Sequence, residues 1–465
     1  MKHVWTAATA LALALAPVTA FADGTTEIDR YVAEFADAAA YRGVAVAVTR
    51  GDRVVHLTGH GTTSTGAPVT PTTRMPIASV SKSFTALAAV QLVERGRLDL
   101  DVPVSRYLPD FQPADPRGAA ITTRHLLNQT SGITDRTLPE KSLPQPRSLA
   151  DAVIRARSAT LAVDPGTKHY YTNTNYHLAA RVVEVVSGEK YADYLRHNIF
   201  EPAGMRSTTT VTTTPDDLPP DVAKGYVYAY GMSIPAAEPT RFVAGSDDVI
   251  TTAEDMAKWL VVQQNNGRTA DGTALVSPEG IKAMHTSSDP RWTYGMGWDT
   301  RDDRVRHNGI WFTHTAGQLL LPSGYGIAVL TNAGVALGNE GTPRWEDGLA
   351  EVVQGGHPTA SSPRLYFDLV LAALTLFSLY RGIRNLRRRT VPKRWVIARL
   401  VPRVVPAVLL FALPGLSGLL MSGGRDLTLG QLAHYSPALV IWVATAAVLN
   451  LAVLGVRVHR ITVAA

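Results

Sequence analysis

A serine and a lysine three residues apart could form a nucleophilic pair. Ser79 and Lys82 open a segment, residues 83–94, that is rich in Ala and Leu and lacks Gly and Pro, which predicts a helix. Positions i and i+3 share one face of a helix, so the two side chains should meet near its free amides. A partly buried lysine near other positive charge can take the proton of a serine hydroxyl. A serine that only caps the helix and a first-turn surface lysine would show the same spacing.

Tyr171 and Asn173 form a Y-x-N pattern between a Pro165-Gly166 turn and a predicted helix over residues 175–187. A phenol can relay a proton where nearby positive charge favours its ionised form. An asparagine amide can hold a substrate carbonyl or steady Lys82. Taken alone, the pattern also fits a loop with ordinary packing.

His307 and Gly309 form an H-x-G pattern ahead of a predicted strand over residues 326–332. The histidine could donate a hydrogen bond to substrate or to Tyr171, and the glycine permits close approach of another backbone. The amide of Ile310 could then join the amide of Ser79 in an oxyanion hole. A surface histidine beside a turn glycine would give the same pattern.

In this order, the three motifs resemble those of the serine β-lactamases and penicillin-binding-protein-like hydrolases, specifically the group related to class C β-lactamases. The resemblance covers about residues 25–350. Further segments resemble family motifs at residues 126–132, 200–205, 251–256 and 294–298. In the first of these, Gln129 stands where the family usually has histidine.

The resemblance implies an α/β (α+β) sandwich in which an antiparallel sheet with flanking helices carries an all-helical subdomain, with the site between them. It implies that Ser79 is acylated and that Lys82 and Tyr171 share the proton transfers. It assigns Asn173 to the substrate amide and the amides of Ser79 and Ile310 to the oxyanion hole. Water would release the acyl group, with Tyr171 as its base.

Two departures bear on the substrate. His307 replaces the lysine of the family's K-T-G motif, and a histidine is mostly neutral near pH 7. As substrate-binding residues, His307 and Gly309 would attract a carboxylate weakly, which favours a D-Ala peptidase or an esterase over an efficient β-lactamase. The bulky Trp311-Phe312 pair after them should reshape the acyl pocket. The alternative is a non-catalytic protein that keeps the fold and binds cell-wall peptide or a membrane partner.

Composition limits the cofactors and partners. The 465 residues include no cysteine, which excludes disulfides and thiolate zinc sites. No H-E-x-x-H or similar cluster occurs among the 13 histidines, so we expect no metal and no cofactor. The net charge of +6 is uneven, because residues 364–465 carry about 13 basic and 2 acidic side chains. The remainder is mildly acidic and lacks a basic stripe, so nucleic acid is not an expected partner.

The fold should draw its sheet from both ends of the globular part. Residues 43–57 predict a hairpin after a helix at 25–40, and the strand at 326–332 is followed by a predicted helix at 344–353. Helices fill the middle. A sheet built from the two ends and packed against helices is the natural arrangement.

Export and anchoring segments flank this domain. Residues 1–22 read as a signal peptide with an A-x-A site before Asp23, or as an uncleaved anchor. We expect a hydrolase domain at 23–353, a linker at 354–363 and a transmembrane region at 364–465, with helices at about 365–380, 404–421 and 437–456. Buried core helices would be the alternative for the last three.

Orientation follows from charge. The segment between the first two apolar helices is rich in arginine, whereas the next one holds only Arg425 and Asp426. The positive-inside rule then places the catalytic domain outside the cell membrane. The expected partners are therefore the lipid bilayer and a small-molecule or peptide substrate, which includes cell-wall peptide.

Overall fold

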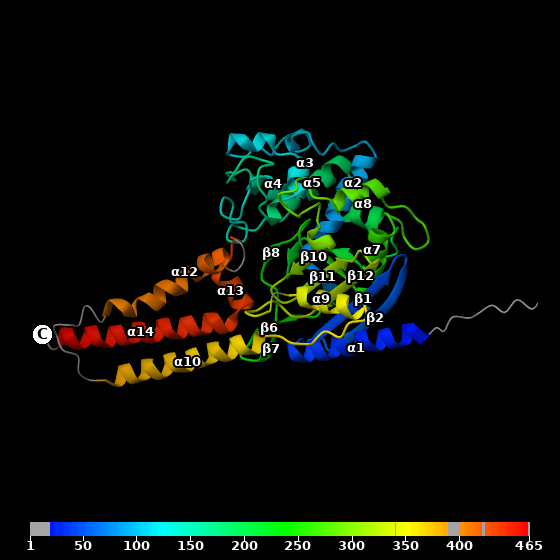
Figure 1. Cartoon of the computed structure of the whole chain (residues 1–465). Coiled ribbons are helices and arrows are strands. Elements are labelled where there is room, and N and C mark those ends of the chain that lie inside the picture. Colours follow the sequence, from blue (N-terminus) through cyan, green and yellow to red (C-terminus); the bar gives the residue numbers. More distant parts are fainter. Residues whose placement is uncertain (1–18, 340, 389–399, 421–423, 464–465) are drawn as a thin grey trace, which may run out of the picture.

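The computed structural model describes residues 19–339, 341–388, 400–420 and 424–463. Figure 1 shows a globular part from which long C-terminal helices project. A five-stranded antiparallel sheet has the order β10-β11-β12-β1-β2. Its strands are β1 (Gly43–Arg50), β2 (Arg53–Gly61), β10 (Val305–Ile310), β11 (Thr315–Leu320) and β12 (Tyr325–Thr331). The predicted sheet from the two ends of the domain is confirmed.

Strand β1 is central and buried on both faces. Its valines Val44, Val46 and Val48 pack with α1 (Thr19–Ala38) and α9 (Pro343–Val352) on one side. The alternate residues, Ala45 and Ala47, face a second and larger core. Side chains alternate across a strand, so a run of small and branched apolar residues suits a strand covered on both faces.

The larger core contains α2 (Lys82–Glu94) and α7 (Ala253–Gln264), which cover the other face of the sheet. It extends into the predicted all-helical part. The helices there are α3 (Thr123–Leu127), α4 (Leu149–Ala156), α5 (Asn173–Ser187) and α6 (Tyr191–Leu195). Helices α4 and α5 pack against each other, and α5 packs on α2. The predicted β-lactamase-like architecture is therefore present.

Short elements connect these layers. They are β3 (Met75–Pro76), η1 (Ala78–Ser81), η2 (Val104–Arg106), η3 (Pro116–Ala120), η4 (Arg196–Phe200), β4 (Thr209–Thr210), β5 (Thr213–Thr214), β6 (Gly225–Ala229), β7 (Met232–Ala236), β8 (Arg241–Phe242), β9 (Val249–Thr251), α8 (Pro278–Met284) and η5 (Arg301–Asp303). Strand β9 lies between β3 and β4, and β6 pairs with β7 as a hairpin. The hairpin contacts the C-terminal helices.

The C-terminal part differs in detail from the expectation. Its elements are α10 (Arg364–Arg387), η7 (Val401–Arg403), α12 (Val405–Leu420), α13 (Leu429–Tyr435) and α14 (Pro437–Val463). Two helical stretches of 24 residues, 364–387 and 437–460, have mean hydropathies of 1.4 and 2.4 and are long enough to cross a membrane. Helix α12 has only 16 residues, because the preceding segment forms the separate turn η7. Three transmembrane helices were expected, and the described residues contain two of spanning length and the shorter apolar helix α12.

Two other segments expected from the sequence lie partly outside the residues that the structure describes. Residues 1–18 of the signal peptide and residues 389–399 of the arginine-rich segment are not described. Helix α1 begins at Thr19 and includes the expected cleavage site. The expected linker falls between α9 and α10.

Helix α9 supports the strand that carries His307. Its Glu346 is fully buried and accepts a hydrogen bond from the Asn308 amide of β10. The carboxylate lies against Gly317 of β11, where an added Cβ would stand 1.7 Å from Oε1. Glu346 Oε2 has no hydrogen-bond partner among the described residues. Burial raises the pKa of Glu346 to about 8, so this carboxyl is neutral in the fold at pH 7.

We expect Glu346→Gln to change the pH dependence of stability. With a folded pKa of about 8 against an ordinary 4.5, the folded protein keeps a proton that the unfolded chain releases. Wild-type stability should therefore fall as pH rises through this window, by up to about 1.4 kcal/mol per unit from this group. Glutamine cannot ionise and removes that slope. In thermal unfolding of the full chain, the Tm of Glu346→Gln should rise relative to the Tm of wild type as the pH increases from 5 to 8.

The matched control is Asp347→Asn, which changes the next residue, a half-exposed carboxylate paired with Arg304. This substitution should leave the pH slope unchanged. An equal difference in Tm between Glu346→Gln and wild type at both pH values would show that Glu346 is ionised in the fold.

Candidate functional site

Ser79 and Lys82 meet as their spacing predicts. Ser79 lies in the turn η1, and Lys82 begins α2, so the two stand one turn apart at the entrance to a buried helix. Lys82 Nζ donates a 2.9 Å hydrogen bond to Ser79 Oγ, and the lysine side chain has no exposed surface. Ala78, just before the serine, has a φ of +46°. Such strained backbone in a non-glycine residue is concentrated at functional sites.

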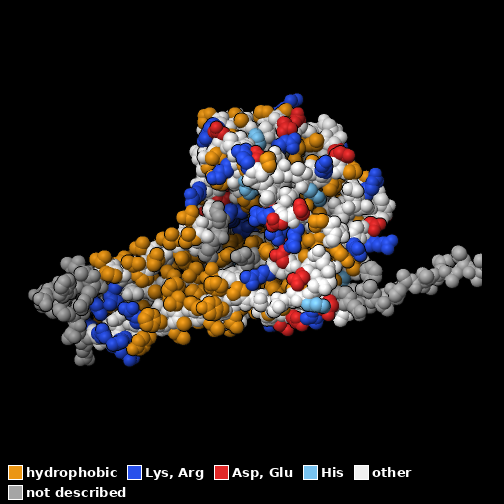
Figure 2. Space-filling model, viewed as in Figure 1, with side chains coloured by type: hydrophobic (Ala, Val, Ile, Leu, Met, Phe, Trp, Pro, Cys, Tyr) orange, Lys and Arg blue, Asp and Glu red, His pale blue; other side chains and the backbone are white. Residues whose placement is uncertain are grey.

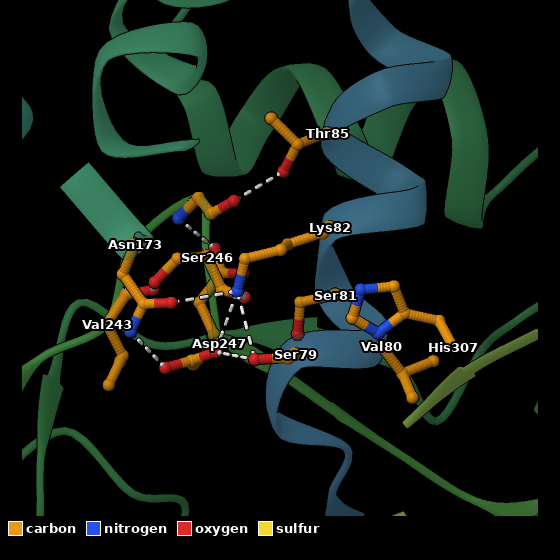
Figure 3. A network of polar contacts seen from close by, with 12 residues as sticks. Ser79, Val80, Ser81, Lys82, Thr85, Asn173, Val243, Ser246, Asp247 and His307 are labelled. Carbon is orange, nitrogen blue, oxygen red and sulfur yellow. Dashed lines mark hydrogen bonds and ion pairs between the residues drawn. The ribbon is translucent and has the colours of Figure 1, made fainter. Parts of the chain in front are cut away.

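Asp247 completes this pair, and the sequence analysis missed it. Its Oδ1 accepts a 2.6 Å hydrogen bond from Ser79 Oγ and lies 3.2 Å from Lys82 Nζ. Its Oδ2 accepts from Asn173 Nδ2 at 3.0 Å and lies 3.4 Å from Arg241. Figure 3 shows Ser79, Lys82, Asn173 and Asp247 directed at one another. One carboxylate thus touches both the candidate nucleophile and its candidate base.

The charge state of this cluster follows from its partners. Burial alone would raise the pKa of Asp247, but the charges of Lys82 and Arg241 and the hydrogen bond from Ser79 outweigh it. The pKa of Asp247 therefore lies well below its ordinary value. Asp247 is therefore ionised and ion-paired with Lys82, whose Nζ is 3.2 Å from its Oδ1. The part of Lys82 in the proton transfers stays a prediction.

A sequence signal for Asp247 was available. Two consecutive acids, Asp247 and Asp248, stand between apolar residues and the strand β9, and both are buried. Acidic residues are rarely buried without a partner, so an acidic pair in an apolar segment is a site candidate. Only Asp247 reaches Ser79. Asp248 accepts from the Gly245 amide, and burial raises the pKa of Asp248 to about 7.

Asn173 is brought to the cluster by the start of α5. Its Oδ1 accepts a 3.0 Å hydrogen bond from Lys82 Nζ, so the amide steadies the lysine, one of the two expected roles. The segment before α5 is held by Gln129, whose side-chain oxygen accepts from the Thr172 amide at 3.1 Å and from Asn175 Nδ2 at 2.7 Å. The glutamine at the family's histidine position therefore fixes the backbone beside Tyr171.

Tyr171 lies between two cations. Lys82 Nζ is 5.0 Å from the centre of its ring, and the Arg425 guanidinium is 5.1 Å from it. Within the described ranges, the Tyr171 hydroxyl has no hydrogen-bond partner, and the residue lines the cleft that contains Ser79. Arg425 comes from the segment between α12 and α13, far away in the sequence, and no motif indicated it.

His307 is close to the cluster but has a different partner from the one expected. Its Nε2 is 2.9 Å from the Tyr294 hydroxyl and its Nδ1 is 2.9 Å from the Asn308 carbonyl oxygen, whereas the Tyr171 and His307 rings are 6.2 Å apart. Burial, with the charge of Lys82, lowers the pKa of His307 to about 3. The imidazole is therefore neutral at pH 7.

Gly309 places the end of β10 beside Ser79. An added Cβ on Gly309 would lie 2.1 Å from the Ile77 carbonyl oxygen, so only glycine permits this approach. Ile310, the next residue, lines the cleft with Ser79. The chain thus brings the two residues whose amides were expected to form the oxyanion hole to one place.

The two bulky residues after Ile310 differ from each other in role. Trp311 is buried, and its indole Nε1 donates to the Asp247 carbonyl oxygen at 3.1 Å, which fixes the backbone of the acid. Phe312 lines the cleft instead. The Arg241 guanidinium lies 5.3 Å from the centre of the Phe312 ring.

The cleft that contains these groups has a volume of about 800 Å³. It contains a serine hydroxyl with a carboxylate and an ammonium group in hydrogen-bond contact, and the phenol of Tyr171 between Lys82 and Arg425. This set suits transfer of an acyl group to the serine. No group of three or more His, Asp or Glu side chains among the described residues is arranged to hold a metal.

The chain is similar in sequence to two bacterial proteins. Protein flp of Staphylococcus aureus (strain MW2) is 27% identical over 321 residues, 67% of this chain and 63% of that protein. The putative penicillin-binding protein PbpX of Bacillus subtilis (strain 168) is 30% identical over 241 residues, 52% of this chain and 57% of the relative. The chain thus spans less than two thirds of either protein.

A solved structure and a family model are also similar to this chain. The octameric penicillin-binding protein homologue from Pyrococcus abyssi superposes with a TM-score of 0.60 at 26% identity, over 75% of this chain and 81% of that one. The family described as Beta-lactamase matches residues 28–350, more than half of the chain. The protein therefore belongs to the β-lactamase and penicillin-binding-protein-like family of serine hydrolases.

Proposed function

We propose that this protein is a membrane-anchored, extracytoplasmic serine hydrolase that cleaves an ester or an amide through an acyl-enzyme on Ser79. The observation that carries the proposal is the position of Ser79 Oγ, which is 2.6 Å from Asp247 and 2.9 Å from Lys82 in an open cleft. A serine needs a neighbouring proton acceptor to attack a carbonyl carbon. The family membership supports the same reaction type.

Acylation uses the groups in contact. Ser79 Oγ attacks the carbonyl carbon while its proton passes to Asp247, and Lys82 stabilises the charge on the oxygen. The amides of Ser79 and Ile310 bind the oxyanion of the tetrahedral intermediate. The hydroxyl of Tyr171 gives its proton to the leaving group, and the carbon–leaving-group bond breaks.

Deacylation restores the resting state. The Tyr171 phenolate, stabilised by the cations on either side of its ring, takes a proton from water, and the resulting hydroxide attacks the acyl carbon. The bond to Ser79 Oγ breaks, and the serine recovers its proton from Asp247. Every proton is returned, and the product is the free acid.

The neutral His307 indicates which substrates fit. A β-lactam presents a carboxylate that a cation would bind, and His307 supplies no positive charge at pH 7 because its pKa is about 3. An ester without a carboxylate is therefore the preferred substrate class, and a D-Ala peptide, which ends in a carboxylate of its own, is the second candidate. Both ring nitrogens of His307 are engaged, by Tyr294 and by the Asn308 carbonyl oxygen. His307 would therefore contact the substrate through its ring, with Gly309 beside it.

Anchoring is supported by the C-terminal helices. Helices α10 and α14 contain the two apolar stretches of spanning length, and arginines gather at the end of α10 away from the globular part (Figure 2). The segment after α12 contacts the catalytic domain, so α12 returns the chain to the side of that domain. This agrees with an extracytoplasmic domain on a multi-pass anchor.

Ser79→Ala should abolish labelling by a fluorescent fluorophosphonate, because the probe needs a nucleophilic hydroxyl. Wild type should label and should release p-nitrophenol steadily from p-nitrophenyl acetate. The control is Ser81→Ala, since the Ser81 hydroxyl accepts the Val249 amide at 2.9 Å and is not part of the contacts between Ser79, Lys82 and Asp247. Equal labelling of wild type and Ser79→Ala, without turnover, would favour the non-catalytic binding protein.

Asp247→Asn should lower the acylation rate by about 10²–10⁴-fold, because Ser79 loses its proton acceptor. Wild-type kcat/KM should show no ionisation of Asp247 or His307 between about pH 5 and pH 8, since Asp247 is ionised and His307 neutral throughout. The control is Asp248→Asn, which changes the adjacent buried acid that does not contact Ser79. Retained activity in Asp247→Asn, with the pH profile moved to higher pH, would assign the base role to Lys82 instead.

A further inference from the structure

The cleft that contains Ser79 has one wall from the C-terminal part of the chain. Leu420 at the end of α12, Arg425 and Leu427 in the segment after it, and Tyr435 at the end of α13 all line this cleft. Figure 2 shows the hollow at the junction of the helical tail and the globular part. The catalytic domain alone therefore does not complete its own site.

This wall is fixed in place by polar contacts. Arg425 Nε donates to Asp135 at 2.7 Å, and the Asp426 carboxylate accepts from the Ser142 amide and hydroxyl at 2.6 and 2.7 Å. Lys141 Nζ donates to the Asp426 carbonyl oxygen at 3.1 Å. Asp135 is nearly fully buried, so the contact excludes water. The segment with Arg425 and Asp426 is therefore packed against the catalytic domain as part of the folded structure.

The other side of the cleft mouth also joins the tail. The Tyr230 hydroxyl, in the turn of the β6–β7 hairpin, lies 3.2 Å from Thr375 Oγ1 of α10, and the Gly231 amide donates to Asp368 at 3.2 Å. Leu337, which lines the cleft, packs in an apolar cluster with residues of α10 and α14. The cleft therefore opens where the tail helices leave the globular part.

Six large apolar side chains line the cleft beside its polar groups. They are Ile310, Phe312, Val335, Leu337, Leu420 and Leu427. Ile310 follows Gly309 at the end of β10, and Leu420 is the last residue of α12, an apolar helix of the tail. Figure 2 shows apolar side chains over the tail helices. The apolar part of the lining is therefore shared between the catalytic domain and the tail.

The basic side chains of the cleft do not require an anionic substrate. Each of the four Lys and Arg side chains that line it already has a carboxylate partner. The pairs are Lys141 and Arg425 with Asp135, Arg241 with Glu238, and Arg306 with Asp347. A substrate carboxylate would have to compete with these partners, whereas a hydrocarbon chain gains contact with the apolar wall.

We propose that the substrate is a membrane-resident amphiphile, an ester or amide of a long acyl chain, whose chain lies on the wall shared by the catalytic domain and the tail. This inference rests on the proposed function and adds the class of acyl group. The tail then presents the bilayer side of the cleft to the substrate as well as anchoring the enzyme.

The test uses the full chain in nanodiscs of ether-linked phospholipid, which offers no ester of its own. Hydrolysis of p-nitrophenyl acetate, butyrate, octanoate and dodecanoate is measured, with the Ser79→Ala rate subtracted. Each fully buried methylene is worth about a fourfold gain, so kcat/KM should rise at least about tenfold from acetyl to octanoyl. A flat or falling series, with acetate cleaved, would overturn the inference and leave the proposed function intact.

A matched pair of variants tests whether the dependence of kcat/KM on acyl-chain length arises at the wall of the cleft. Leu420→Ser should reduce the octanoyl-to-acetyl ratio of kcat/KM by about threefold to tenfold, because Leu420 lines the cleft. Leu419→Ser changes the neighbouring exposed leucine, which does not line it, and should keep the wild-type ratio. Equal ratios for both variants would overturn the role of the wall. Absence of any Ser79-dependent hydrolysis or labelling would instead count against the proposed function.

Discussion

The buried ion pair between Lys82 and Asp247 is the contact on which the site depends. Two opposite charges out of water are stable only when each is paired and hydrogen-bonded. Here the lysine is held by Ser79, Asn173 and the Ser246 carbonyl oxygen, and Asp247 accepts from Ser79 and Asn173. The serine hydroxyl completes the network, so its position follows from the geometry of the pair.

Several layers of the fold meet to hold that pair. Helix α2 supplies Lys82, α5 supplies Asn173, and the segment before β9 supplies Asp247. Strand β10 closes the arrangement through Gly309, which has room for no side chain against Ile77. Behind that strand, neutral Glu346 of α9 fills the space over Gly317. A change in any of these layers moves the groups around Ser79.

The C-terminal segment adds a second buried network beside the first. Arg425 contacts the Tyr171 ring and pairs with Asp135. Burial alone would lower the pKa of Arg425, but Asp135 and Glu140 outweigh it and raise that pKa. The two networks meet at Tyr171, between Lys82 and Arg425. A tail that only tethered the domain would need no such contact with the site.

Local rules predicted the parts of the site that are close in sequence. The three-residue spacing of Ser79 and Lys82 sets their contact, because one helical turn brings them together whatever surrounds them. The run of small and branched apolar residues likewise predicted the strand β1, whose side chains alternate between two cores. The order of the motifs gave the family resemblance, and with it Tyr171, Asn173 and His307.

The remaining features depended on contacts between distant segments. Asp247 is no part of any recognised motif, and only the packing of its segment beside η1 and α2 turns its carboxylate to Ser79 and Lys82. His307 bonds to Tyr294 because β10 and the Tyr294 segment pack together. The sequence by itself determined the candidate nucleophile, the lysine beside it and the sheet. The tertiary structure decided the proposed proton acceptor and the wall of the cleft, because burial and ion pairing are set by neighbours far away along the chain.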